Sequence, residues 1–415
     1  MHLELATSSH GDHVIRTAVI HKDASIGTTR IRYKLFGNNI AEQPASMDGF
    51  VFAIILHAMK YGKPLRIHGP VTREALHNLE ELQQAWTLWK PDTYRHIDIT
   101  AEKVIDRVPA SGHRSIAAFS GGLDSTFTVL RPRMGLAGSG SYNIDSVLLV
   151  HGFDIGIDNH DYFDKAIERS RPFIERLGLD LRLIQTNSEN PLFQDWEDSH
   201  GAELACCLHQ YADEFQFGLL GSTKPYDGLV LPYGSNPATD HLLSGGGFSI
   251  VHDGAGYSRT AKAALLTNYD YAVQQLRVCY QGKLQYRNCG QCEKCLRTYL
   301  NFLAAGEDRP ACFDIVPDKA LLSTIKTHSE AQVAELVSIV NYARKHNVSA
   351  DWLDAVQRSI DSHVPRSRLR SNAKKLGIGT KRVIADVLGF LRLKRPIKTV
   401  LHKVYAAGAP VIPKI

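Results

Sequence analysis

The sequence lacks any long apolar run and any leader-like start. Its longest apolar stretch, residues 50–59, is interrupted by His57 and falls far short of the roughly 20 residues that a membrane-spanning helix needs. The chain begins Met-His-Leu-Glu, without the basic and then apolar pattern of a secretory signal. We therefore expect a cytoplasmic protein without a transmembrane segment.

Low-complexity tracts and internal repeats are also missing, which argues against a disordered chain or a solenoid. Hydrophobic residues make up 44% of the chain and charged residues 22%, close to the averages of globular proteins. At 415 residues the chain is too long for one ordinary domain, because domains contain roughly 100–200 residues. We expect two or three folded domains.

Cysteine is scarce, with seven residues, but four of them are crowded near position 290. This distribution fits metal ligation in a reducing compartment better than a disulfide framework. The four follow the pattern C-x9-C-x2-C-x2-C and are Cys279, Cys289, Cys292 and Cys295. Four thiolates can close a tetrahedron around Zn²⁺, which would make the site structural because no position stays open for water. An iron–sulfur cluster also uses four cysteines.

The other three cysteines, Cys206, Cys207 and Cys312, have no such spacing. We expect them to be buried as small hydrophobic residues.

Positive charge is concentrated near the C-terminus. Residues 366–403 contain twelve Lys or Arg against one acidic residue, Asp386, a net charge of +11 in a chain whose total is +5. Such a segment could contact a nucleic acid or another polyanionic acceptor. Apolar residues at helical spacing within it fit instead a helix that packs on the protein with its charges in water.

Three regions follow from the pattern of apolar residues. Residues 1–110 combine short β-like runs with helical patterns and predict a small α/β domain of unknown role. Residues 111–310 alternate apolar strands with helices, which predicts an α/β domain built on a doubly wound parallel sheet. Residues 311–415 are predicted to be helical and to end in the basic segment. In a doubly wound sheet, ligands bind at the carboxyl ends of the strands.

A candidate phosphate loop lies between a predicted strand at 115–119 and a predicted helix at 125–130. Adjacent glycines let backbone N–H groups point at phosphate oxygens, and a following helix start adds partial positive charge. A glycine turn that binds nothing would have the same local composition, but the strand and helix flanks favour an anion site. The residues predicted to bind the phosphates are Phe119, Ser120, Gly121, Gly122, Leu123, Asp124, Ser125 and Thr126.

This loop has neither the Walker pattern nor the dinucleotide-binding glycine pattern. Its sequence, Ser-Gly-Gly-Leu-Asp-Ser, resembles the loop of the PP-loop ATP pyrophosphatases. The resemblance implies a PP-loop fold of the HUP type, in which the loop holds the pyrophosphate part of ATP and the α-phosphate is attacked. It also implies that Asp124 helps to hold Mg²⁺, which would offset the charge of the departing pyrophosphate.

The loop together with the cysteine pattern and Arg297 resembles the 7-cyano-7-deazaguanine synthase family. In that family ATP adenylates the carboxylate of a deazapurine, and ammonia converts it to an amide and then a nitrile. The tyrosine- and proline-containing stretch by which the family recognises its base is replaced here by residues 231–240 and 252–262. The resemblance therefore leaves the substrate of this chain open.

Further candidates lie on the expected ligand rim. His151 and Asp154 follow a predicted strand and could line an adenosine pocket, although a polar strand end would look alike. Arg259 and Lys262 are three residues apart, so on a helix both could face a phosphate or equally be solvated charges. Together with Ser120 and Asp124, these two cations are the predicted catalytic residues. Four further residues are candidate acid–base groups: Asp240, His241, His252 and Asp253.

The leading hypothesis is an ATP-dependent ligase that adenylates a carboxylate, releases pyrophosphate and passes the activated group to a nitrogen nucleophile, which could belong to a protein or nucleic acid. One alternative is a tRNA-thiolating PP-loop enzyme, in which case iron–sulfur occupancy of the cysteines would be expected. Another is a zinc-stabilised nucleic-acid-binding protein with a vestigial ATP fold, supported only by the basic segment.

Overall fold

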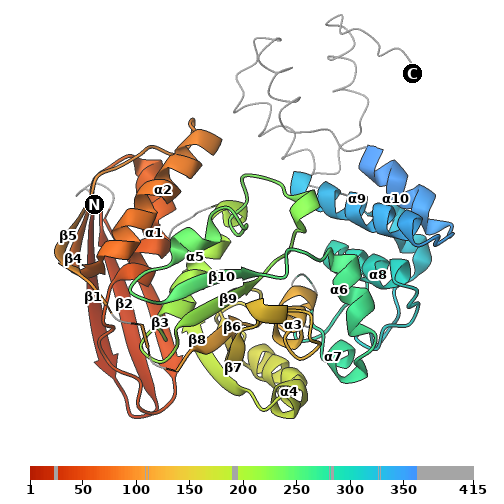
Figure 1. The fold of residues 1–415 in the computed structure, drawn as a ribbon, viewed down its shortest axis with the longest axis horizontal. Helices are drawn as coiled ribbons and strands as arrows, with labels where there is room; N and C mark the ends of the chain where they lie inside the picture. The colour runs from red at the N-terminus through yellow and green to blue at the C-terminus, as the bar shows by residue number, and fades with distance from the viewer. Residues whose placement is uncertain are drawn as a thin grey trace, which may run out of the picture. The chain divides into compact units, whose positions relative to one another are not determined.

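The computed structural model describes most of the first 361 residues (Figure 1). The described residues are 1–22, 27–107, 109–110, 112–188, 195–279, 281, 285–325, 327 and 329–361. Residues 1–361 form one compact unit. The basic segment at 366–403 lies outside the described residues, so its predicted partners stay predictions.

A mostly parallel sheet forms the centre of this unit, and the prediction of an α/β protein is confirmed. Within the described residues it has ten strands in the order β10-β9-β6-β7-β8-β3-β2-β1-β4-β5. The strands are β1 (His2–Ser9), β2 (His13–His21), β3 (Thr28–Phe36), β4 (Leu65–Thr72), β5 (Ile99–Ile105), β6 (Arg114–Ala118), β7 (Asn143–His151), β8 (Asp180–Thr186), β9 (Phe217–Gly221) and β10 (Ser249–Asp253).

The strands of the predicted central region are all parallel to one another and lie in the order β8-β7-β6-β9-β10. The chain adds β7 and β8 on one side of β6, and β9 and β10 on the other, so the winding direction reverses at β6. Ligands in such sheets bind in the crevice at the carboxyl ends of the strands where the order reverses. The loop after β6 therefore occupies the position at which a ligand is expected.

The N-terminal strands extend the same sheet. β3 pairs antiparallel with β8, with Tyr33 opposite Thr186 and Phe36 opposite Leu183. The domain boundary predicted near residue 110 falls between β5 and β6, and the strands on its two sides belong to one sheet. Figure 1 shows this continuity from the red strands of the N-terminal region to the yellow and green strands of the central region.

Helices cover both faces of the sheet. Those of the described residues are α1 (Asp48–Tyr61), α2 (Arg73–Trp89), α3 (Leu123–Leu130), α4 (His160–Arg176), α5 (Trp196–His209), α6 (Arg259–Leu266), α7 (Asp270–Gln274), α8 (Glu293–Ala304), α9 (Glu330–Lys345) and α10 (Trp352–Asp361), with short 3-10 helices η1 (Gly138–Gly140), η2 (Tyr226–Gly228), η3 (Asp240–Leu243) and η4 (Lys319–Thr324). None of the described helices combines the length and the apolar character that a membrane crossing requires.

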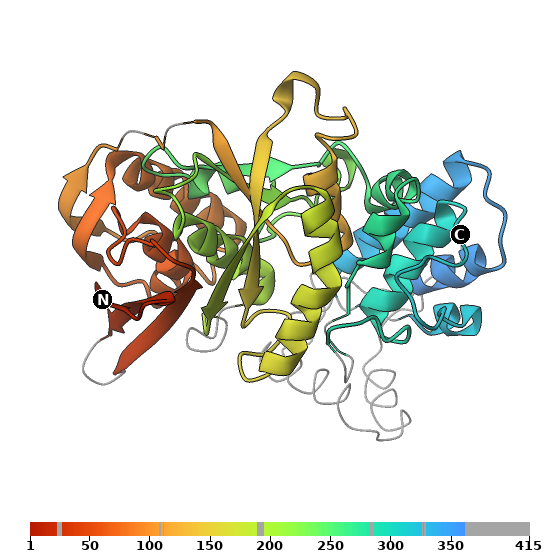
Figure 2. The ribbon, with the colours of Figure 1, turned by 90° about the horizontal axis from the view of Figure 1, so that it is seen from below.

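Successive side chains of the central strands point to opposite faces of the sheet, and each face has its own hydrophobic core. On β6, Ile116 and Ala118 pack into a core with α1, α2 and α5, whereas Ala117 packs into a second core with α4, α6, α8 and α9. Since both faces of a parallel sheet are covered, its strands consist of nearly continuous apolar residues. Figure 2 shows α4 lying along the second face.

The helical pattern predicted after residue 311 is found as α9 and α10 within the described residues. α9 begins after Ser329, whose hydroxyl accepts a hydrogen bond from the Gln332 N–H at 3.3 Å. A serine cap of this kind satisfies one of the backbone donors that a helix start leaves unpaired. It also fixes the register of α9, and through it the position of Glu335.

Candidate functional site

A cavity of about 820 Å³ opens at the carboxyl ends of β6, β7 and β9. Its walls come from the ends of these strands and the loops after them, the first turns of α5, and residues of α4, α6, α8 and α9. Small-molecule sites in proteins typically have volumes of roughly 300–1,000 Å³. The cavity is therefore large enough for a ligand of nucleotide size.

The structure brings most of the predicted loop residues to this cavity. The lining includes Phe119, Ser120, Asp124, Ser125, Asp154 and Arg259. Gly121, Gly122 and Leu123 lie between these residues in the same loop. Thr126 faces the protein interior instead, where its hydroxyl accepts a hydrogen bond from Gln275 at 2.8 Å.

The candidate phosphate loop has the backbone geometry that its glycines allow. Gly121 has φ +74°, in the left-handed region that residues with a Cβ rarely adopt. The Ser125 hydroxyl donates to the Gly122 carbonyl at 3.2 Å and closes the turn into α3. Among the described residues no side chain caps the start of α3, so the N–H groups of its first turn could bind an anion.

Arg277 holds this loop from behind, and sequence reasoning did not single it out. Its backbone N–H donates to the Gly121 carbonyl at 2.8 Å, and its guanidinium donates to the Ser120 carbonyl at 3.1 Å. The same guanidinium reaches the Gln285 carbonyl at 3.2 Å and Asp154 at 3.5 Å. Arg277 thus joins the loop after β6 to the loop after β7 and to the cysteine-bearing segment.

Asp124 lies between the two predicted cations. Its Oδ2 accepts from Arg259 Nε and Nη2 at 2.8 and 2.6 Å, and its Oδ1 accepts from Lys262 Nζ at 3.2 Å. Burial alone would raise the pKa of Asp124, but the two cations outweigh burial and lower it below its ordinary value. The carboxylate is therefore ionised at neutral pH.

This pairing bears on the predicted Mg²⁺ site. Both Asp124 oxygens are engaged by cations, so a metal ion could reach the carboxylate only after Arg259 or Lys262 turned away. Lys262 is almost fully buried, whereas Arg259 lines the cavity. Arg259 is therefore the partner that could turn toward a bound phosphate.

A second acidic residue, Glu335, lies next to cations from three segments of the chain. Its carboxylate accepts from Arg259 at 2.9 and 3.0 Å and from Arg297 on α8, and it lies 3.9 Å from Lys224 Nζ. Arg297 also binds Glu293 at 2.6 Å. The chain of ion pairs runs from the phosphate loop through α6 and α9 to α8, the helix that begins after Cys292 and carries Cys295.

The rim residues His151 and Asp154 have different environments. His151 is buried, is not among the residues that line the cavity, and stacks on Phe163 with ring centroids 4.4 Å apart. Its Nε2 bonds to the Gly156 carbonyl at 3.1 Å, and its Nδ1 faces the Gln185 amide at 3.2 Å. His151 thus supports the loop after β7, while Asp154 within that loop faces the cavity.

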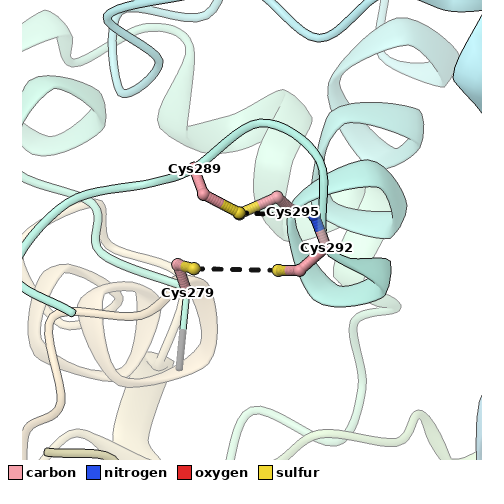
Figure 3. A group of neighbouring side chains, drawn as sticks. All are labelled: Cys279, Cys289, Cys292 and Cys295. Carbon is pink, nitrogen blue, oxygen red and sulfur yellow. Dashed lines mark hydrogen bonds between the residues drawn. The ribbon is translucent and has the colours of Figure 1, made fainter. Parts of the chain in front are cut away.

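The four cysteines converge on one point (Figure 3). The sulfurs of Cys279 and Cys292 are 3.7 Å apart, and those of Cys289 and Cys295 are 3.8 Å apart. A tetrahedral zinc site with Zn–S bonds of about 2.3 Å has sulfurs about 3.8 Å apart. The group could therefore hold a single metal ion such as zinc. An iron–sulfur cluster inserts several iron atoms between its thiolates and needs a wider arrangement.

Local hydrogen bonds build this metal-ligand geometry. Gly290 has φ +70°, and the turn it allows lets the Cys292 N–H donate to Cys289 Sγ at 3.3 Å. The Asn288 side chain accepts from the Val278 N–H at 2.8 Å and donates to the Cys312 carbonyl at 2.9 Å. This amide ties the segment before the first cysteine to the turn that carries the others. The thiols of Cys206, Cys207 and Cys312 are buried outside the group, as predicted.

The far half of the cavity is formed by α5 and the loop after β9. Trp196 and His200 stack with ring centroids 4.5 Å apart, and Tyr233 meets His200 edge to face at 4.8 Å. Glu203, one turn further along α5, is buried and accepts from the Ser188 hydroxyl at 3.1 Å. Burial raises the pKa of Glu203 and lowers that of His200. Sequence reasoning missed this half, because its residues form no motif.

Residues from the N-terminal region anchor α5. Asp198, buried in the first turn of α5, accepts from Lys90 Nζ at 2.6 Å and from the Tyr94 hydroxyl at 2.8 Å. Both partners follow α2. The N-terminal strands and helices therefore fix the helix that supplies the far wall of the cavity.

The candidate acid–base residues do not form one group. His252 bonds to Asp240 at 2.7 Å, and Asp240 also accepts from the Ser235 hydroxyl at 2.7 Å. Asp253 pairs with Arg131 instead. His241 is exposed. Of this set, the structure connects only the His252 and Asp240 pair to a cavity residue, through Ser235.

Comparisons with family models, curated proteins and solved structures return no match for this chain.

Proposed function

We propose that this chain is an ATP-dependent adenylating ligase that resembles 7-cyano-7-deazaguanine synthase and activates a carboxylate with release of pyrophosphate. The observation that carries the proposal is the position of the Ser120–Ser125 loop. The loop follows the strand at which the sheet reverses its winding, opens into the large cavity, and contacts Arg259 through its own Asp124. The loop whose sequence indicates phosphate binding therefore lies where the topology of the sheet places a ligand.

The polar groups around the loop suit a transfer that releases pyrophosphate. Backbone N–H groups at the start of α3 and the Ser120 and Ser125 hydroxyls would bind phosphate oxygens. Arg259 would turn from Asp124 toward the departing pyrophosphate, which frees the carboxylate for Mg²⁺. Mg²⁺ would supply charge neutralisation at the phosphates. A carboxylate is a poor electrophile, and bonding it to AMP makes attack by nitrogen feasible.

The far half of the cavity suits a planar substrate with hydrogen-bond donors. The ring pair of Trp196 and His200 offers a stacking surface, and aromatic pairs of this kind contribute about 0.5–1.5 kcal/mol beyond area burial. Glu203 offers an acceptor inside the cavity wall. A deazapurine carboxylate would place its ring there and its carboxylate toward the loop.

The four cysteines would hold zinc in a structural role. A four-thiolate shell leaves no position for a substrate. The sulfur separations favour one ion over a cluster, which weakens the tRNA-thiolating alternative. The nucleic-acid-binding alternative depends on the basic segment, outside the described residues.

The test is product analysis with the full-length protein. We expect incubation with ATP, Mg²⁺, ammonia and 7-carboxy-7-deazaguanine to yield AMP, pyrophosphate and a new amide or nitrile, detected by mass spectrometry. Ser120→Ala should reduce pyrophosphate release by about 10²-fold, the typical loss when one preorganised donor is removed. Ser141→Ala, an exposed serine before β7, is the matched control.

Two results would contradict the proposal. One is ATP that stays intact with this substrate and with a panel of other carboxylates. The other is pyrophosphate release that is equal in the wild type and in Ser120→Ala.

A further inference from the structure

Lys224 is a buried amine in the wall of the cavity that the proposed ATP chemistry does not use. It follows β9, the neighbour of β6, so it lies near the carboxyl ends of the two strands at the winding reversal. Its side chain is only 9% exposed and lines the cavity. Burying a charged lysine costs free energy unless neighbouring groups compensate its charge.

The closest partners of Lys224 compensate its charge only in part. Its Nζ donates to the Ala331 carbonyl, a neutral acceptor. The nearest carboxylate, Glu335, is 3.9 Å away and is already bound by Arg259 and Arg297. Glu335 thus divides its charge between Lys224 and two arginines that lie closer to it, so it compensates an ammonium on Lys224 only in part.

The charged groups around this amine come from five helices. They are Asp124 on α3, Glu197 on α5, Arg259 on α6, Arg297 on α8 and Glu335 on α9. Burial first, and then the two arginines, lower the pKa of Lys224 to about 7, against the opposite influence of Asp124 and Glu197. A large fraction of the amine is therefore neutral at physiological pH and has a free lone pair.

We propose that Lys224 is the general base of the second half-reaction, in which the nitrogen nucleophile attacks the adenylated carboxyl group. This assignment rests on the proposed adenylating function. Lys224 lines the same cavity as Ser120 of the phosphate loop and Glu203 of the far half, so its amine faces the space in which an activated acyl group would meet the nucleophile. General bases of matched pKa contribute about 10²–10⁴-fold to rate.

The lone pair of ammonia or a primary amine forms a C–N bond to the acyl carbon, and the attacking nitrogen becomes positively charged. Lys224 Nζ takes one proton from that nitrogen and becomes an ammonium. The C–O bond to AMP then breaks, AMP leaves with the electron pair, and the amide remains. The cation that forms on Lys224 would attract the departing AMP phosphate within the same cavity, which favours the products.

The test separates the two half-reactions in the full-length protein. Lys224→Met keeps the size of the side chain and removes the base, and Lys224→Arg keeps a charge without a usable base. Lys60→Met, an exposed position at the end of α1, is the control. With ATP, Mg²⁺ and 7-carboxy-7-deazaguanine but no amine, we expect the pyrophosphate burst of Lys224→Met to stay within about threefold of wild type.

With ammonia added, amide formation by Lys224→Met should fall by about 10²-fold or more. The wild-type rate of amide formation should rise through an inflection near pH 7, which the variant should lose. Hydroxylamine, a stronger nucleophile that depends less on a base, should reduce the defect. Labelling of the Lys224 amine with an acylating reagent should reach half its maximum near pH 7, whatever the substrate.

Three results would overturn the assignment. A pyrophosphate burst lost together with amide formation would make Lys224 a phosphate-binding residue. Normal amide formation by Lys224→Met, with the burst intact, would remove its role while leaving the proposed function in place. A wild type that releases no pyrophosphate would overturn both proposals.

Discussion

The two halves of the cavity are built in different ways. The phosphate half is a short, continuous segment between β6 and α3 whose shape follows from its own glycines and hydroxyls. The far half depends on α5, which is held by Lys90 and Tyr94 from a region about 100 residues earlier. One half is specified locally and the other by long-range packing. Substitutions should therefore separate ATP chemistry from recognition of the second substrate.

The largest effect is expected at the metal site. Cys292→Ser should lose the zinc ion, because three thiolates no longer close the tetrahedron. Structural zinc binds zinc-finger peptides with about 10–16 kcal/mol, and binding to the folded state is folding free energy. We expect a Tm lower by about 10 °C or more, since 1 kcal/mol corresponds to roughly 2–4 °C in domains of 150–250 residues.

Metal analysis and thermal unfolding measure this effect. Cys312→Ala is the matched control, because that thiol is buried outside the group and should leave about one zinc per chain. Loss of the metal should also disturb the phosphate half of the cavity, because α8 carries Arg297 and its contact to Glu335. Full zinc content and an unchanged Tm in Cys292→Ser would contradict the metal-site interpretation.

The next largest effect is expected at Arg277. Arg277→Met removes the guanidinium that binds the Ser120 carbonyl and Asp154 but keeps the backbone bond to Gly121. Misplacing a reacting group by about 1 Å can cost about 10²-fold, or roughly 2.7 kcal/mol. Pyrophosphate release should fall by this amount, while equilibrium binding of the second substrate without ATP should not change. Equal losses in both measurements would mean that the two halves are not separable.

The sequence was informative wherever function depends on neighbouring residues. The Ser120–Ser125 loop, its flanking strand and helix, and the four cysteines could be predicted because each consists of residues close together in the chain. Asn288 directly precedes Cys289, but its own role could not be predicted from the cysteine pattern. Its bonds to Val278 and Cys312 explain why an amide stands there.

Long-range partners could not be predicted in the same way. Glu335 meets Arg259 across 76 residues, and nothing in the local pattern of α9 distinguishes this glutamate from a solvated one. The joining of the N-terminal strands to the central sheet through β3 and β8 was missed for a related reason. Alternating apolar residues indicate which face of a strand is buried but not which strand lies beside it.

A smaller effect is expected where the N-terminal region holds α5. Lys90→Met removes the cation from buried Asp198 and leaves Tyr94 as its partner. A hydrogen bond to a charged group contributes about 1.5–3 kcal/mol, and Lys90 is partly exposed, so the lower end applies. The KM of the second substrate should rise by about 3–10-fold with little change in the KM of ATP. Lys103→Met on β5 is the control. A rise in the KM of ATP alone would mean that the N-terminal region supports the phosphate half of the cavity and not the far half.

The smallest effect is expected at Glu203, and it concerns pH. Burial raises the pKa of this carboxyl above its ordinary value of 4.5. As pH rises through 4.5, the unfolded chain loses the Glu203 proton while the folded protein keeps it, so the free energy of unfolding falls by up to about 1.4 kcal/mol per pH unit. The decline ends above the raised pKa of the folded state. Stability from this group is therefore greatest in acid and is lost toward neutral pH.

Glu203→Gln removes the titration while keeping the shape and the bond to Ser188. Urea unfolding of both proteins from pH 4 to 8 should show the stability difference, variant minus wild type, rising with pH and then levelling. The difference cancels other titrating groups because both proteins contain them. A second substrate that donates N–H groups to Glu203 should favour the carboxylate, so its binding should weaken in Glu203→Gln while the pyrophosphate-releasing half of the cavity is unaffected. A stability difference that is flat with pH would mean that Glu203 is ionised in the folded protein, and the far half would then be a site for cations.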